Sequence, residues 1–271
     1  MALTEHQAKQ PKWKQAPVWP LTQMELGKYT TKAAKQLQCM GWHAFIKHLQ
    51  STSNLSSQLQ SWNHPAIPAF NQIHKHGAPG VSIMEPSWSI ARHNKAVVRG
   101  SHPSATHIFN HFLKTEMMDM ISKGYWIVLP YRSIKHFSHL KISLAGIVLQ
   151  RTWWPRLIID YSYSGQNQTS LPLAPPQTMQ FGHTFQRVLQ KVVHANPAFS
   201  PVEIIKLDLA DGYYRFPVSS SGVQQLGIIL PPMMAKQPLI AFPLALPKGW
   251  SESLPLFCMF MEMVANITNT Q

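Results

Sequence analysis

Two acidic side chains follow an apolar run in the second half of the chain. Ile204, Ile205 and Leu207 form the run, and Asp208 and Asp211 come next. Branched apolar residues in this order predict a buried strand, which places Asp208 at its tip. Because an unpaired buried carboxylate costs several kcal/mol, we expect Asp208 to have a cationic partner or to bind a metal ion. A turn or capping aspartate is the alternative that the spacing leaves open.

The residues around these aspartates carry a resemblance to a known family. Positions 206–218 read Lys-Leu-Asp-Leu-Ala-Asp-Gly-Tyr-Tyr-Arg-Phe-Pro-Val. This segment resembles motif A of the retrotransposon-type reverse transcriptases, which are RNA-directed DNA polymerases (nucleotidyltransferases). The resemblance implies that Asp208 is the first catalytic, metal-binding carboxylate of the palm. It also implies that Leu209 offers its backbone carbonyl to the metal, and that the cofactor is Mg2+.

The same resemblance assigns the next residues to the substrate. It places Asp211 and Gly212 under the incoming triphosphate and Tyr213 beneath its sugar. A bulky ring at Tyr213 leaves no room for a 2′-hydroxyl, so the site would favour deoxynucleotides. The alternative for Tyr213 and Tyr214 is simple packing as strand aromatics.

A basic, aromatic tip separates two predicted strands upstream, at residues 146–150 and 157–161. The tip, residues 151–156, reads Arg-Thr-Trp-Trp-Pro-Arg. The pair resembles the fingers hairpin of the same family. The resemblance gives Arg156 the triphosphate-binding position, where a guanidinium can bind phosphate oxygens in a bidentate manner. Arg151 would assist, and we expect Asp160 to be structural.

A third segment, Leu-Pro-Lys-Gly-Trp at 246–250, resembles motif B, the loop and helix that follow in this family. Its glycine, Gly249, would let the backbone approach template and nucleotide. Lys248 stands where the family has Gln or Phe, and we expect it to contact a phosphate or a base. The usual proline of the motif is displaced by one position, to Pro255.

The resemblance covers about residues 124–260 and stops before the Tyr/Phe-x-Asp-Asp turn of the family. No Asp follows Asp211, and the later acidic residues are Glu252 and Glu262. Two-metal phosphoryl transfer needs convergent carboxylates. We therefore expect a chain that is inactive alone and lacks a C-terminal polymerase portion. A non-catalytic nucleic-acid-binding remnant and an open reading frame without function are the alternatives.

The charge distribution bears on the partner. The net charge is +13, and residues 1–150 carry +11 of it, with 16 Lys and Arg against 5 acidic residues. Such an imbalance predicts a polyanionic partner. We place nucleic acid ahead of a membrane because no basic stretch has a clean amphipathic face. The resemblance specifies an RNA or DNA template-primer and deoxynucleotides, and a merely solvated basic surface is the alternative.

Nothing in the sequence predicts export or membrane insertion. The first residues lack an apolar signal core, and no apolar run reaches the ~18 residues that span a bilayer. Cys39 and Cys258 are too far apart in sequence for a metal motif, and four histidines match no zinc signature: His43, His48, His74 and His76. We expect an intracellular protein, in the cytoplasm or the nucleus.

The elements that would position these residues belong to an α+β protein, an incomplete right-hand polymerase fingers and palm preceded by a mainly helical basic region. The expected segments are a basic arm and helical N-terminal region with a Ser/Gln/Asn-rich linker (1–64), a helical region (65–123), a fingers-like segment (124–200) and a partial palm (201–271). Periodicity predicts helices at 24–49 with a break at Gly41-Trp42, 65–76, 88–99, 104–123 and 175–195. Strands are predicted at 125–130, 146–150, 157–161, 226–230 and 239–246.

Overall fold

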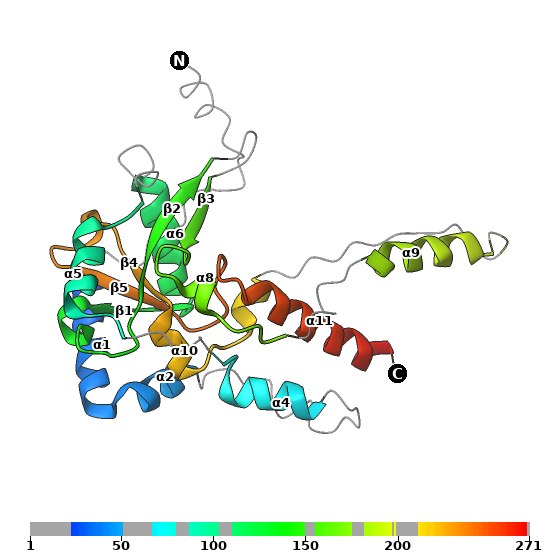
Figure 1. Cartoon of the computed structure of the whole chain (residues 1–271), viewed down its shortest axis with the longest axis horizontal. Helices are drawn as coiled ribbons and strands as arrows, with labels where there is room; N and C mark the ends of the chain where they lie inside the picture. The colour runs from blue at the N-terminus through cyan, green and yellow to red at the C-terminus, as the bar shows by residue number, and fades with distance from the viewer. Residues whose placement is uncertain are drawn as a thin grey trace, which may run out of the picture.

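A computed structural model describes residues 23–50, 67–79, 87–102, 110–149, 155–174, 182–196, 198 and 211–269. These residues form a mixed α and β structure that combines helices with one five-stranded sheet (Figure 1). The expected combination of helices and strands is therefore confirmed. The strand predicted just before Asp208 lies outside the described residues.

The sheet has the strand order β1-β5-β4-β2-β3. Its strands are β1 (Trp126–Pro130), β2 (Ile142–Val148), β3 (Arg156–Asp160), β4 (Gly227–Ile229) and β5 (Leu239–Pro243). β2 and β4 run parallel, and the other neighbouring pairs are antiparallel. The predicted strands in these regions are confirmed, with bounds shifted by a few residues. One sheet thus joins strands from the segments 124–200 and 201–271.

Burial along the strands explains their sequences. Every residue of β1, β4 and β5 is buried, which is why these strands read as continuous apolar runs rather than as alternating patterns. The first residue of β4 is Gly227. A glycine is needed there because a Cβ would lie 2.7 Å from the backbone oxygen of Lys141. At the sheet edge, β3 is mostly exposed or half-buried, and its side chains can therefore meet a ligand.

The helices match most of the sequence expectations, with shorter bounds. They are α1 (Gln23–Met40), α2 (Trp42–Gln50), α4 (Ile67–His76), α5 (Ile90–Arg99), α6 (Asn110–Ser122), α7 (Tyr131–Ile134), α8 (Gln166–Thr169), α9 (Gly182–His194), α10 (Ser220–Gln225) and α11 (Ser253–Asn269), with 3-10 turns η5 (Gly212–Arg215) and η6 (Pro232–Met234). The predicted break falls at Gly41, whose φ of 73° separates α1 from α2. Gly124, with a φ of 70°, follows α6 as predicted.

The first two helices attach to the second half of the chain through side-chain hydrogen bonds. Trp42 Nε1 donates to the backbone oxygen of Ser220 at 2.6 Å, and His43 Nδ1 lies 2.6 Å from the Ser220 hydroxyl. Gln50 Nε2 donates to the carbonyl of Val218 at 2.7 Å. Together with α1, which packs on β1, these contacts make α1 and α2 part of the same folded unit as the sheet.

Among the helices that the structure describes, none combines the length and the apolar character that crossing a membrane requires.

Candidate functional site

The loop that carries Gly249 lies against the end of β3. Gly249 has a φ of 98°, and a Cβ at this position would be 2.7 Å from the backbone oxygen of Ile159. Asn167, at the start of α8, ties the two together: its Nδ2 donates to the Gly249 carbonyl at 3.1 Å, and its Oδ1 accepts from the Ser251 amide at 2.9 Å. Two of the sequence segments singled out above therefore meet, and glycine is required where they touch.

Further hydrogen bonds hold this loop before α11 begins. Ser253 Oγ donates to the Pro247 carbonyl at 2.6 Å, and Trp250 Nε1 donates to Ser170 Oγ at 2.7 Å. Glu252 is buried, and its carboxylate accepts the Leu173 amide at 2.9 Å. The loop is thus a closed network of side-chain to backbone bonds rather than an open tip.

Two exposed cations flank this contact. Arg156 begins β3, where it pairs with Val148 of β2, and its side chain is exposed. It precedes Ile159 by three strand residues, about 10 Å along the chain. Lys248 is exposed, and its Nζ lies 6.0 Å from the ring centroid of Tyr214. The fold thus brings Arg156 and Lys248 onto adjoining segments although they are far apart in sequence.

Asp211 adopts an unusual backbone conformation. Its φ is 55°, which makes it the one non-glycine residue with a positive φ among the described residues, and it caps η5. Its Oδ2 accepts from the Tyr125 hydroxyl at 3.1 Å and lies 3.7 Å from Lys123 Nζ. Lys123 Nζ also pairs with Asp119 at 2.8 Å. The carboxylate of Asp211 is therefore engaged with protein groups.

Aromatic rings surround Asp211. Tyr125 stacks on Tyr214 with ring centroids 4.6 Å apart. Burial, followed by the negative charge of Asp211, raises the pKa of Tyr214 far above its ordinary value, and burial together with the Asp211 hydrogen bond raises the pKa of Tyr125. The hydrogen bond to Asp119 raises the pKa of Lys123 against an opposing effect of burial. At neutral pH both phenols are protonated and Lys123 is charged.

Tyr213 packs against α11. Its ring stacks on Phe257 with centroids 4.8 Å apart, while the ring of Phe216 stacks on Phe260 at 4.0 Å. Tyr213 is half-buried, so part of the ring still reaches solvent. Gly212, between Asp211 and Tyr213, opens the 3-10 turn. This turn is consequently anchored to α11 by ring stacking.

Three of the predicted site residues lie outside the described residues: Asp208, Leu209 and Arg151. In the part of the chain that the structure does describe, no group of three or more His, Cys, Asp or Glu side chains is placed to hold a metal ion. Asp160, expected to be structural, accepts the Tyr163 amide at 3.0 Å and so shapes the turn after β3.

Sequence reasoning missed Lys123 and Tyr125 as partners of Asp211. The contact spans 86 positions in sequence, and no local pattern marks such a pair. It also missed Tyr161, which is fully buried beneath the Gly249 loop, with its Cδ2 3.7 Å from the position of a Gly249 Cβ. The one local signal for Tyr161 was its place directly after Asp160 in the hairpin segment.

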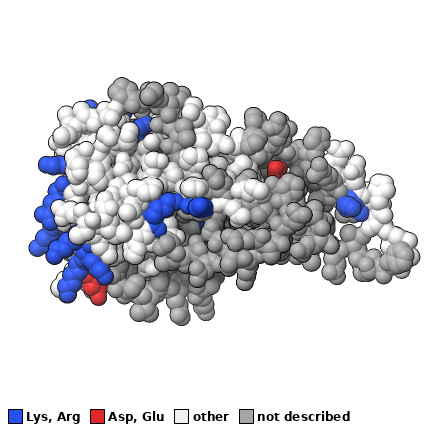
Figure 2. All heavy atoms as spheres, turned by 90° about the horizontal axis from the view of Figure 1, so that it is seen from below, with Lys and Arg blue, Asp and Glu red and all other residues white. Residues whose placement is uncertain are grey.

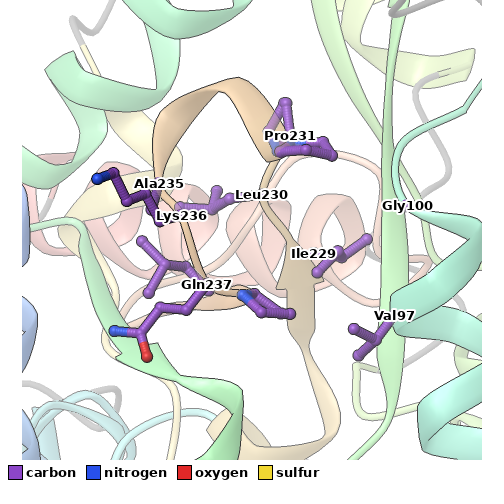
Figure 3. A pocket seen from close by; sticks show the side chains of 11 residues that line it. Val97, Gly100, Ile229, Leu230, Pro231, Ala235, Lys236 and Gln237 are labelled. Carbon is purple, nitrogen blue, oxygen red and sulfur yellow. The ribbon is translucent and has the colours of Figure 1, made fainter. Parts of the chain in front are cut away.

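A separate hollow of ≈ 190 Å³ lies between the end of α5 and the connection from β4 to β5. Figure 3 shows apolar side chains such as Val97 and Ile229 facing it, whereas the polar ends of Lys236 and Gln237 turn away. None of the predicted site residues lines it. It is therefore distinct from the Gly249 loop.

Comparison with models of known protein families finds no match to this chain, and comparison with curated proteins finds no match either.

Proposed function

We propose that this chain is a fingers and partial palm of a retrotransposon-type reverse transcriptase, whose parent enzyme performs template-directed DNA synthesis. The observation that carries the proposal is the contact between the Gly249 loop and the end of β3, joined by Asn167. In this family the corresponding segments border one cleft, so their contact is what the proposal requires. An intracellular location, where template and deoxynucleotides are found, belongs to the same proposal.

The proposal gives specific roles to the exposed cations and rings. Arg156 binds the triphosphate of an incoming deoxynucleotide, assisted by Arg151, because a guanidinium can hold phosphate oxygens in pairs. Lys248 contacts a phosphate or the template. Tyr213, packed on Phe257 with part of its ring in solvent, lies beneath the sugar and excludes a 2′-hydroxyl.

The carboxylates explain why the chain alone is expected to be inactive. Glu252 is committed to the Leu173 amide, and Asp211 to Tyr125 and Lys123. Neither is free to complete a pair of metal sites, and two-metal catalysis needs several convergent ligands. The proposal therefore assigns Mg2+ to Asp208 and Leu209 alone and includes no catalytic step.

A second candidate is a nucleic-acid-binding remnant without chemistry. It is favoured by the net charge of +11 on residues 1–150. This charge attracts a polyanion even if the palm has no catalytic activity. The two candidates share the nucleic-acid partner and differ in whether a deoxynucleotide binds at the Gly249 loop.

The test is retention and extension of a primed homopolymer by the purified chain, with Mg2+ or Mn2+, beside an Asp208→Ala control. We expect the primed template to be retained at low salt and the primer to stay unextended. Extension by the wild type that Asp208→Ala abolishes would show that the chain is active alone. Absence of retention at low salt would contradict both candidates.

A further inference from the structure

The helix α5 presents a basic ridge on its outer side, which we define as Arg92, Lys95 and Arg99. All three side chains are exposed. At about 100° per residue they fall within about 60° of the helix circumference. Another side of the helix is buried, with His93 Nε2 2.8 Å from the Leu140 carbonyl and Ala96 facing the core. The helix thus has one inward face and an exposed surface on which the three cations are accompanied by the apolar side chains of Ile90 and Val98.

Two of these cations are held in place by aromatic rings. The guanidinium of Arg92 lies 4.1 Å from the ring centroid of Trp88, and that of Arg99 lies 4.8 Å from the ring of Tyr163. Cation–π contacts of this kind limit the freedom of a long side chain before any ligand arrives. The α5 ridge is therefore a prearranged row of charges.

Acidic residues are scarce in the segments that adjoin the ridge. Asp160 lies on the segment that carries Tyr163, and its carboxylate accepts the Tyr163 amide at 3.0 Å. The described stretches 87–102, 131–141 and 227–246 contain no Asp or Glu. The neighbouring helix α7 is joined to α5 by a 2.8 Å hydrogen bond from the Tyr131 hydroxyl to Asn94, and it adds the exposed Arg132. Figure 2 shows Lys and Arg side chains along its left edge, with acidic atoms at the lower end of the row, and both α1 and α5 lie on this side in Figure 1.

We propose that the α5 ridge binds the phosphate backbone of a nucleic-acid duplex without reading its sequence. Arg92 and Arg99 are separated by seven residues, about 10.5 Å along the helix. Successive phosphates of one duplex strand advance by about 3.4 Å along the axis, so the ridge matches about three steps. The site lies apart from the Gly249 loop and does not depend on the polymerase-like proposal.

The covered rings explain why a duplex is expected rather than a single strand. Proteins that hold single strands offer open aromatic faces on which bases stack. Here Trp88 is only 6% exposed, and the rings of Trp88 and Tyr163 lie beneath guanidinium groups. The ridge offers charge but no stacking platform. Ile90 and Val98 of α5 are exposed, but the exposed Asn94 lies between them on the helix circumference. Two separate apolar side chains do not form the broad apolar face with which a helix enters a membrane.

The helix α1 supplies a matched control. Lys28, Lys32 and Lys35 are also exposed and occupy a similar arc, but Glu25 in the first turn lies on that same arc. No aromatic contact is found for these lysines among the described residues. Removing three charges from α1 therefore changes the net charge as much as removing three from the α5 ridge, while sparing the proposed site.

The experiment measures binding of a 20-bp duplex across a salt series, for the whole chain and three variants. The triple variant Arg92→Gln, Lys95→Gln, Arg99→Gln should flatten the slope of log affinity against log salt by about 2 to 3, since each lost phosphate contact contributes about 0.9. The matched variant Lys28→Gln, Lys32→Gln, Lys35→Gln should change it by less than about 1. The variant Arg92→Lys, Arg99→Lys keeps the charges and should retain most of the slope.

One further variant and three further ligands make the result decisive. Lys95→Glu touches neither aromatic ring, so it should flatten the slope even if the triple variant unfolds. A single strand of the same sequence should bind more weakly than the duplex, and a duplex of unrelated sequence equally well. Three results would overturn the proposal. The first is an equal loss of salt slope in the α1 and α5 triple variants, and the second is unchanged duplex binding after Lys95→Glu. The third is binding to phosphatidylserine vesicles but not to duplex. None of these outcomes bears on the Gly249 loop.

Discussion

The Gly249 loop and the α5 ridge are organised in opposite ways. The loop is fixed by hydrogen bonds from side chains to the backbone, through Asn167, Ser253 and Glu252. The ridge is part of a helix and presents exposed charges, through Arg92, Lys95 and Arg99. A surface shaped by backbone contacts suits a ligand of defined form, whereas a row of charges suits a polymer that repeats the same group. The difference predicts which substitutions will alter stability and which will alter binding.

The largest effect is expected at Gly249. Gly249→Ala places a Cβ 2.7 Å from the Ile159 oxygen at a φ of 98°, so we expect a loss of about 3 kcal/mol in the free energy of unfolding. Gly27→Ala is the control, because Gly27 lies within α1 with no heavy atom within 4 Å of the new Cβ. That variant should gain about 0.5–1 kcal/mol. Denaturant unfolding measures both, and equal stabilities would show that the loop does not press on β3.

The buried carboxylate of the loop should come next. Glu252→Ala leaves the Leu173 amide without its acceptor, which should cost about 2 kcal/mol. Glu262→Ala removes an exposed carboxylate from α11, the helix that follows the loop, and should stay within about 0.5 kcal/mol of the wild type. Faster hydrogen exchange at the Leu173 amide in the first variant would locate the effect. If the Glu262 substitution were the more harmful one, the assignment of Glu252 to a structural bond would be wrong.

At Tyr161 a substitution should increase the stability of the fold. Its hydroxyl is fully buried and has no hydrogen-bond partner among the described groups. Tyr161→Phe should therefore keep the fold and stabilise it by about 1 kcal/mol at pH 7. The control is Tyr131→Phe, which loses the hydrogen bond to Asn94 and should be slightly destabilising.

The pH dependence sharpens the prediction for Tyr161. Burial raises its pKa well above the ordinary value of 10.0. Above pH 10 the unfolded chain loses this proton while the folded chain keeps it, so the unfolded state binds fewer protons and stability falls as pH rises. Tyr161→Phe should lose less stability than the wild type between pH 10 and about 11.5. If the free energy of unfolding fell equally with pH in the wild type and in Tyr161→Phe, the burial of this hydroxyl would be contradicted.

The smallest effect is expected at Asp211. Asp211→Asn keeps a residue that tolerates a positive φ and an oxygen that can accept from Tyr125, and it removes the ion pair with Lys123. Because that ion pair is partly exposed, the free energy of unfolding should change by about 0.5 kcal/mol or less. Thermal unfolding checks this, and a loss above about 2 kcal/mol would mean that the carboxylate has a stronger partner.

Local patterns were sufficient for most of the longer elements of the fold, whereas the short helices α7, α8 and α10 were not predicted. Helical spacing predicted α5 and α6, Gly41 and Gly124 marked helix ends, and continuous apolar runs predicted β1 and β5. These signals act within a few residues, because capping and periodicity are local properties. Bounds shifted because the periodicity of a segment does not specify where its last hydrogen bond lies.

Contacts between distant segments could not be predicted in the same way. Nothing near Trp42 indicates that its indole donates to Ser220, and nothing near Asp211 indicates Tyr125. The sequence showed Glu252 only as one of two acidic residues after Asp211, and its bond to Leu173 became visible only in the fold. No local signal in the sequence indicated the meeting of Gly249 with β3, while Asp208, Leu209 and Arg151 stay predictions.

The most direct test of the central claim is photolabelling with a reactive thymidine triphosphate in the presence of a template-primer. If the Gly249 loop and β3 form one deoxynucleotide site, label should appear in peptides that carry Arg156, Tyr213 and Lys248. Unlabelled dTTP should compete at lower concentration than UTP, because the ring of Tyr213 excludes a 2′-hydroxyl, and Arg156→Gln should reduce labelling while Arg132→Gln should not. Label confined to α5, or label that dTTP does not displace, would contradict the claim.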